Sequence, residues 1–208
     1  MLAAVLRADG RKVVAKTTGS QPRIILSDGT ERPVRRKGVP SILEQVRFLE
    51  VATEHRAQAV VVEIMSVHEE NHLVESRKIL QPHLVLVTNF RVDHVEAAGW
   101  SREEVAALHL ADIPPGSTVV MPEGELIPGF AESVEELGAV LIPVVMPKED
   151  PCGIGVAIPG IGVAIPGSGV AAPGSGIPTP VPTPPFLSEN LALVRSAARE
   201  LGVPEEAV

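Results

Sequence analysis

Short apolar runs, each followed by polar or charged residues, recur along about the first 145 residues, and segments with helical spacing separate them. Runs of this kind are typical of buried strands in a parallel sheet. Strands are expected at 12–15, 59–64, 83–88, 118–121 and 139–144. Helices are expected at 2–8, 40–52, 71–80 and 131–137, with another beginning after residue 101. This alternation predicts an α/β fold with three layers around a mainly parallel sheet.

A hairpin interrupts the alternation. Two short segments, 23–26 and 31–34, flank a turn that contains Asp28 and Gly29. An Asp-Gly pair between such segments favours a tight turn, so these segments are expected to pair antiparallel.

The helix at 40–52 is expected to turn its apolar side chains towards the core, because they recur with helical spacing. The side chains expected to face inward are Ile42, Leu43, Val46, Phe48 and Leu49. Ser101 and Glu104 have the spacing of a capping box, which predicts the start of the next helix.

Composition narrows the classes of function. A formal net charge of −8 argues against nucleic-acid binding, which needs a basic surface. The single cysteine, Cys152, rules out an intramolecular disulfide and is consistent with a reducing cytosol. No apolar stretch approaches the roughly 20 residues of a membrane span, and no signal peptide is evident. A cytoplasmic location is therefore expected.

A repeat of seven residues changes the pattern after residue 150. Gly-Ile-Gly-Val-Ala-Ile-Pro at 153–159 is followed by an identical copy at 160–166, and degenerate copies and Thr-Pro pairs continue to 185. Proline in every copy excludes a coiled coil, so a mostly disordered low-complexity segment is expected. The chain is thus divided into 1–150, an insert at 151–186 and a helical segment at 187–208.

Polar side chains at three expected strand ends suit a phosphate-and-metal site. They are, in chain order, Lys16, Thr17, Thr18, Glu63, Asn89, Asp93 and His94. Polar residues at the carboxyl ends of strands lie where open α/β sheets bind ligands. Simpler interpretations stay open: Glu63 could be a residue that emerges into solvent, and Lys16 a solvated charge.

Five motifs, taken in order, resemble one known family. They lie at 14–23, 33–36, 42–45, 62–67 and 88–94. Together they resemble the central ATPase domain of the Mur ligase superfamily, specifically poly-γ-glutamate synthases of the CapB/PgsB type. The resemblance covers about residues 1–145 and returns in the helix at 187–207.

The resemblance implies an ATP-dependent ligase that joins a carboxylate to an amine through an acyl phosphate, with ATP and Mg²⁺. Glu63 and His94 match the family's metal-binding catalytic positions, and Lys16, Thr17, Thr18 and Asn89 match its nucleotide-contacting positions. Glutamate or poly-γ-glutamate is the implied substrate. The implied partners are other subunits of a membrane-bound synthase, which would place this chain at the inner face of the membrane.

A basic cluster includes Arg35 and Arg36 in an otherwise acidic chain. Such clusters are usually only solvated. A glutamate-polymer substrate would give their guanidinium groups carboxylates to bind in a forked geometry. The remaining histidines have no comparable context and are expected to be ordinary surface or packing residues.

The chain departs from the family at two places. The Gly-rich phosphate loop, G-x-x-G-K-[ST], is absent from the 208 residues, and the repeats are not part of the family pattern. The expectation is a copy that is incomplete at its N-terminus, with impaired use of ATP. The alternative is a non-catalytic remnant or scaffold that keeps the ligase fold.

Overall fold

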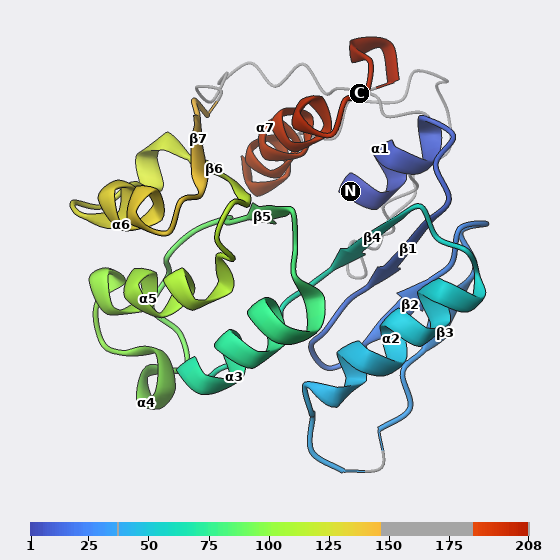
Figure 1. Cartoon of the computed structure of the whole chain (residues 1–208), viewed down its shortest axis with the longest axis horizontal. Helices are drawn as coiled ribbons and strands as arrows, with labels where there is room; N and C mark the ends of the chain where they lie inside the picture. Colours follow the sequence, from blue (N-terminus) through green and yellow to red (C-terminus); the bar gives the residue numbers. More distant parts are fainter. Residues whose placement is uncertain (37, 147–184, 208) are drawn as a thin grey trace, which may run out of the picture.

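The structure is a computed structural model that describes residues 1–36, 38–146 and 185–207 (Figure 1). The repeats at 153–184, and therefore almost all of the predicted insert at 151–186, lie outside the described residues. The α-helices are α1 (Leu2–Ala8), α2 (Leu43–Glu54), α3 (Glu69–Val74), α4 (Val95–Ala98), α5 (Arg102–His109), α6 (Phe130–Glu136) and α7 (Pro185–Glu200). The segments with other helical geometry are the π-helix η1 (Glu75–Leu80) and the 3-10 helices η2 (Leu110–Asp112), η3 (Glu123–Glu125) and η4 (Glu205–Ala207).

The described strands form two ladders. The first has the order β3-β2-β1-β4 and the second the order β5-β6-β7. Their bounds are β1 (Val13–Lys16), β2 (Arg23–Ile25), β3 (Glu31–Pro33), β4 (Ala59–Val62), β5 (Leu84–Leu86), β6 (Thr118–Pro122) and β7 (Val140–Val144). β1 and β4 are parallel, as are β5, β6 and β7, whereas β2 and β3 add antiparallel strands. The predicted α/β class is confirmed, with its strands distributed over a mixed and a parallel ladder.

Side chains of β1 alternate between two helical layers. Val13 and Ala15 pack with α1 and with the end of α7, whereas Val14 packs with Phe48 of α2 on the opposite face. All four residues of β1 are buried, which is expected for a strand covered on both faces. The predicted three-layer arrangement therefore holds around β1.

The second ladder has its own core. Val119 and Met121 of β6 pack with Phe90 and with Phe130 of α6, and the two phenylalanine rings meet edge to face with centroids 5.0 Å apart. α5 closes this core, and its predicted capping box at Ser101 is present.

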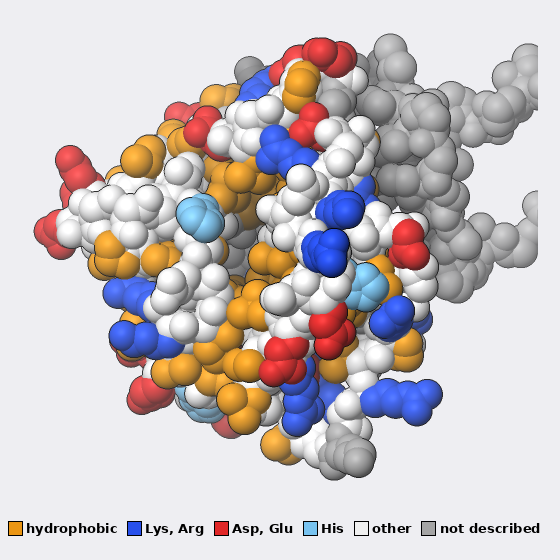
Figure 2. Space-filling model, turned by 45° about the vertical axis from the view of Figure 1, so that its right-hand side comes forward, with side chains coloured by type: hydrophobic (Ala, Val, Ile, Leu, Met, Phe, Trp, Pro, Cys, Tyr) orange, Lys and Arg blue, Asp and Glu red, His pale blue; other side chains and the backbone are white. Residues whose placement is uncertain are grey.

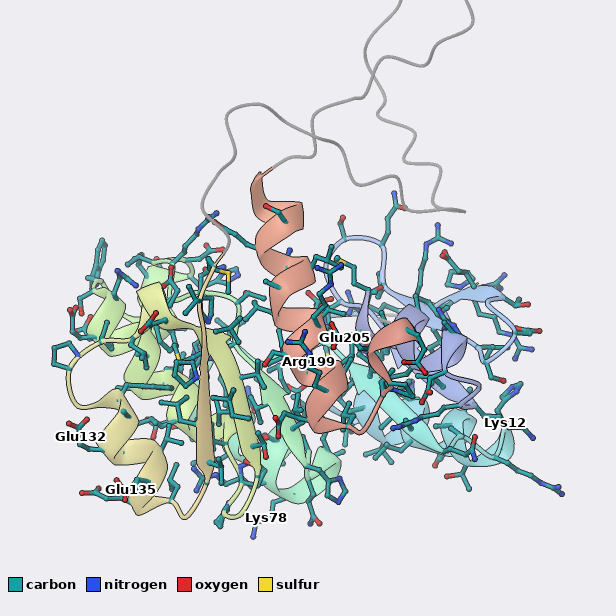
Figure 3. All side chains as sticks on the ribbon, turned by 90° about the horizontal axis from the view of Figure 1, so that it is seen from above. Lys12, Lys78, Glu132, Glu135, Arg199 and Glu205 are labelled. Atoms are coloured by element: carbon teal, nitrogen blue, oxygen red, sulfur yellow. The ribbon has the colours of Figure 1, made fainter. Side chains whose placement is uncertain are left out.

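α7 connects the two halves. It packs against α1 on one side and against β5, β6 and β7 on the other, and in the view from above it lies between the two halves (Figure 3). Leu193, Val194, Ala197 and Ala198 of α7 are buried. The side chain of Arg199 forms an ion pair with Glu205 that holds η4 against the end of α7.

The predicted apolar face of the helix at 40–52 is partly wrong. Phe48 is fully buried, but Leu43 is 61% exposed and Val46 is 39% exposed. Glu44 and Gln45 are buried in their place, because each has polar partners in the interior. Figure 2 shows one face of the molecule, on which hydrophobic side chains lie at the surface between charged ones.

Two local predictions, the hairpin and the helix at 71–80, are confirmed. The hairpin forms, with Gly29 at a φ of +85° and the N–H of Thr30 donating to Asp28 Oδ1 at 2.8 Å. The expected helix at 71–80 forms as α3, which continues into the π-helical segment η1. None of the helices in the described ranges is long and apolar enough to span a membrane.

Candidate active site

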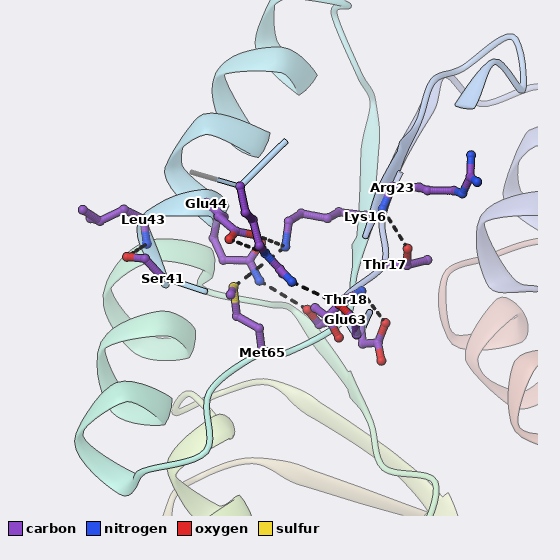
Figure 4. Close-up of polar contacts among 12 residues, drawn as sticks. Lys16, Thr17, Thr18, Arg23, Ser41, Leu43, Glu44, Glu63 and Met65 are labelled. Atoms are coloured by element: carbon purple, nitrogen blue, oxygen red, sulfur yellow. Dashed lines mark hydrogen bonds and ion pairs between the residues drawn. The ribbon is translucent and has the colours of Figure 1, made fainter. Parts of the chain in front are cut away.

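Parallel pairing brings the carboxyl ends of β1 and β4 together. Lys16 lies opposite Val62, so the residues that follow each strand become neighbours. The backbone N–H of Thr18 donates to Glu63 Oε2 at 2.7 Å (Figure 4). Two residues predicted from separate strand ends therefore meet, and Glu63 is exposed to solvent as its position at a strand end suggests.

The hydroxyl group of Thr17 is hydrogen-bonded within the described part of the chain, whereas that of Thr18 is not. Thr17 Oγ1 accepts a hydrogen bond from the backbone N–H of Arg23 at 3.1 Å, which ties the turn after β1 to β2. Within the described residues, the Thr18 hydroxyl and Glu63 Oε1 make no hydrogen bond. These two oxygens remain available to a ligand.

Lys16 is buried, so the interpretation as a solvated charge is wrong. Its side chain is 1% exposed, and its Nζ lies 3.6 Å from Glu44 Oε2 and 3.8 Å from Met65 Sδ. Burial lowers the pKa of Lys16, and the charges of Glu44 and Glu75 oppose this only in part. A buried ammonium beside a carboxylate is an ion pair of the interior.

Glu44 is the acceptor shared by two cations. Arg36 donates to it in a forked geometry, Nε to Oε1 at 2.7 Å and an Nη to Oε2 at 3.1 Å. Burial acts to raise the pKa of Glu44, but hydrogen bonding and charge from Arg36, with a contribution from Lys16, hold it below its usual range. Arg36 also donates to the carbonyl of Gly19 at 3.0 Å, so it fixes the turn that carries Thr18.

Of the two arginines predicted to bind substrate, Arg36 is therefore engaged within the chain. Arg35 is exposed, and in the described part of the chain its side chain makes no hydrogen bond or ion pair. Arg35 is the one with a guanidinium group free for a carboxylate.

A fully buried carboxylate, Glu75 at the start of η1, holds the loop that follows Glu63. It accepts hydrogen bonds from the backbone N–H groups of Met65 and Ser66 at 3.0 and 2.9 Å, and also from the Ser66 hydroxyl. Gln45 Nε2 donates to Glu75 at 2.5 Å and to the Glu63 carbonyl at 3.2 Å. Glu75 and Gln45 thus position the backbone on which Glu63 stands.

The side chains of Asn89 and His94, after β5, are held only by near neighbours among the described residues, whereas the N–H of Phe90 between them donates to Glu125 Oε2 at 3.1 Å. Asn89 accepts from the Arg91 N–H and donates to the Thr88 hydroxyl. His94 has a φ of +49°, and its side chain is 66% exposed, 3.9 Å from the carboxylate of Asp93. No hydrogen bond or ion pair joins His94 to Glu63 among the residues that the structure describes.

Asn89 also lines a cavity of about 340 Å³. The other side of this cavity is formed by Glu189, Asn190 and Leu193 of α7. The carboxyl end of β5 is therefore hollowed and partly covered by α7.

Sequence reasoning missed the buried polar residues. Glu44 and Gln45 lie inside a motif that carried the family resemblance, but periodicity gave no signal of their burial, because the helix contains several other polar residues. Glu75 had no signal either, because its partners lie about ten and thirty positions away along the chain.

Comparison with known proteins identifies the family. No protein-family model matches the chain. The capsule biosynthesis protein CapB of Bacillus anthracis is 31% identical over 144 residues, which cover 68% of this chain and 31% of that protein. The PGA synthase CapB of Bacillus subtilis is 30% identical over 140 residues, which cover 66% of this chain and 36% of that protein. The chain is a distant homologue of CapB. It spans about a third of the length of these two relatives.

Solved structures agree on the fold. A mutant of L. casei FPGS matches with a TM-score of 0.61 at 16% identity, covering 98% of this chain and 56% of that one. A second match is a folylpolyglutamate synthase/dihydrofolate synthase from Yersinia pestis, complexed with AMPPNP and a Mn ion. Its TM-score is 0.52 at 18% identity, and the match covers 68% of this chain and 38% of that one. The predicted Mur-ligase-like fold is thus confirmed for this homologue of CapB.

Proposed function

We propose that this chain supplies the metal- and carboxylate-handling part of an ATP-dependent amide ligase that synthesises poly-γ-glutamate. The observation that carries the proposal is the contact between Thr18 N–H and Glu63 at the paired ends of β1 and β4. It occurs within a chain homologous to a capsule biosynthesis protein and to a PGA synthase. The reaction proposed is activation of a carboxylate as an acyl phosphate, followed by attack of an amine.

The residues at this site fit Mg²⁺. Mg²⁺ prefers oxygen ligands and retains several waters, so it needs few protein ligands. Glu63 Oε1 and the Thr18 hydroxyl are such oxygens, and both lack hydrogen bonds in the described residues. The imidazole of His94, when neutral, is a further candidate ligand. Mg²⁺, when bound, neutralises phosphate charge during phosphoryl transfer.

The chain's own contribution is positioning. Arg36 holds the turn at Gly19, Thr18 orients Glu63, and Glu75 fixes the loop that follows. Fixed placement of reacting groups supplies a large part of the rate in such reactions. The exposed Arg35 is the proposed contact for carboxylates of glutamate or of the growing polymer. Other subunits of a membrane-bound synthase are the proposed partners.

The test is the variant Glu63→Ala, expressed from the complete reading frame that contains these residues. ATP- and Mg²⁺-dependent amide formation from glutamate should fall by about a hundredfold or more, because a metal-binding charge is lost. Glu103→Ala, which removes an exposed carboxylate of α5, is the matched control and should keep full activity. Near-wild-type turnover of Glu63→Ala with an unchanged Mg²⁺ dependence would remove Glu63 from the site.

Nucleotide affinity gives a second test, on the 208 residues alone. They contain no G-x-x-G-K-[ST] sequence, and loops of that kind provide the main contacts to the β- and γ-phosphates. Calorimetry is expected to detect weak or no binding of ATP–Mg²⁺. Tight binding would show that the phosphates are held elsewhere in the chain. A wild-type protein from the complete frame that folds but forms no amide would favour the scaffold alternative.

A further inference from the structure

Three ionisable side chains converge outside the candidate active site. His72 of α3 and His109 at the end of α5 both direct Nδ1 towards the carboxylate of Asp112 in η2. The two contacts are 2.8 Å to Oδ1 and 2.9 Å to Oδ2, so each ring uses a different oxygen. The rings meet edge to face with centroids 5.6 Å apart.

The cluster is closed on one side and open on the other. His72 is 2% exposed and Asp112 is 4% exposed, whereas the side chain of His109 is 33% exposed. An ion could therefore enter past His109 and reach donors that solvent barely touches.

We propose that His72, His109 and Asp112 form a binding site for a divalent transition-metal ion of the Zn²⁺ class. One donor atom from each residue lies within 4.8 Å of the other two. Two imidazoles and a carboxylate, with one position left for water, are a common ligand set of Zn²⁺. Two nitrogen donors favour Zn²⁺, Co²⁺ or Ni²⁺ over Mg²⁺, which prefers oxygen.

The geometry needs little change to hold an ion. Contacts of 2.8–2.9 Å are hydrogen bonds. Tetrahedral ligand bonds of about 2.0–2.2 Å place neighbouring donors about 3.3–3.6 Å apart, so each ring must separate from the carboxylate by about half an ångström. The donor atoms already lie within 4.8 Å of one another, so closing them around an ion needs side-chain shifts of similar size or somewhat larger. Burial acts to raise the pKa of Asp112, but the hydrogen bonds from His109 and His72 outweigh it and keep the pKa below its usual range. The carboxylate therefore carries its negative charge at neutral pH.

η1 fixes the turn that carries Asp112. The Ser76 hydroxyl donates to the Asp112 carbonyl at 2.5 Å, and Arg77 donates to the carbonyls of Leu110 and Ala111 at 2.7 and 3.2 Å. A ligand backbone held in this way is pre-organised, which favours metal binding. The bound ion would join α3 to α5 and η2.

Metal titration of the 208-residue chain, after treatment with a chelator, tests the proposal. Calorimetry is expected to show about one equivalent of Zn²⁺ at the cluster, and Mg²⁺ in excess should not compete. His109→Ala should weaken this binding by at least about tenfold, since it removes one of three ligands. His55→Ala removes a partly buried histidine outside the cluster and should leave the affinity unchanged.

Nuclear magnetic resonance of the wild-type chain avoids dependence on variants. Of the six histidines in the chain, only His72 and His109 should change their Nδ1 resonances as the first equivalent of Zn²⁺ binds. Resonance changes confined to other histidines would overturn the proposal. So would an unchanged affinity in folded His109→Ala, or the absence of any micromolar binding by the wild-type chain.

Discussion

The ends of β4 and β5 carry the two halves of the candidate active site, and they are built differently. At the end of β4, Glu63 stands on a loop whose backbone is held by the buried Glu75 and Gln45. At the end of β5, the side chains of Asn89 and His94 have polar contacts, among the described residues, only with residues one or two positions away along the chain.

The difference separates parts of the site that are fixed by folding from parts that are not. Buried, hydrogen-bonded carboxylates are costly to leave unpaired, so they hold their neighbours in one arrangement. Exposed side chains with only local contacts hold little of the surrounding structure in place. Substitutions at the end of β4 should therefore reduce stability in proportion to burial, whereas those at the end of β5 should not.

The largest expected effect is that of Glu75→Ala. Removal of this carboxylate leaves the buried donor of Gln45 and the partly buried donors of Met65 and Ser66 without their acceptor. The free energy of unfolding should fall by about 4 kcal/mol, since each unsatisfied buried donor costs about 1–3 kcal/mol. Urea denaturation measures this. A loss below about 1 kcal/mol, the low end of that range for a single donor, would show that the loop does not depend on Glu75.

Glu44→Gln should cost about 3 kcal/mol, because it leaves the buried Lys16 without its counter-ion. The pH dependence is a second readout. The pKa of Glu44 lies below its unfolded value, so its contribution to stability is complete above the unfolded pKa and is lost as pH falls through the folded pKa. Between about pH 5 and pH 3, the variant should lose less stability than the wild type. Parallel curves for the two proteins would contradict this assignment.

The smallest effects are expected from the paired variants Glu63→Ala and His94→Ala. Glu63→Ala removes one partly solvated hydrogen bond, worth about 1 kcal/mol. His94→Ala removes an exposed ring and should change stability by less than about 0.5 kcal/mol. Urea denaturation of both variants measures the two losses in unfolding free energy and so compares the end of β4 with the end of β5. A larger loss of stability for His94→Ala than for Glu63→Ala would contradict the view that the end of β4 is the more firmly held.

The positions of the strands and the polar residues at their ends could be predicted from the sequence, because both depend on the order of apolar and polar residues within a short segment. An apolar run predicted β4, and the acid at its end predicted the exposed position of Glu63. Parallel pairing with β1 then brings Thr18 to Glu63 without further information. The hairpin at Gly29 could also be predicted from a local signal, the Asp-Gly pair in its turn.

Buried polar residues could not be predicted in the same way. Hydrophobic periodicity assigns Glu44 to the surface, and only Arg36 and Lys16, from other segments, make its burial favourable. His72 and Asp112 are forty residues apart, and their contact depends on how α3 packs near η2. The separation of the strands into two ladders is likewise a property of the whole fold.

The position of α7 between the two halves has a consequence for biosynthesis. Its Ala198 and the nearby Val203 complete the core formed by Leu6 and Val13, and Arg11 donates to the Leu201 carbonyl across 190 residues of sequence. Chains grow at about 5–20 residues per second, so the surface around Leu6 and Val13 waits about 10–40 seconds for its cover. During that interval the nascent chain presents apolar surface to chaperones. The packing of α7, which is synthesised after the strands of both ladders, covers that surface.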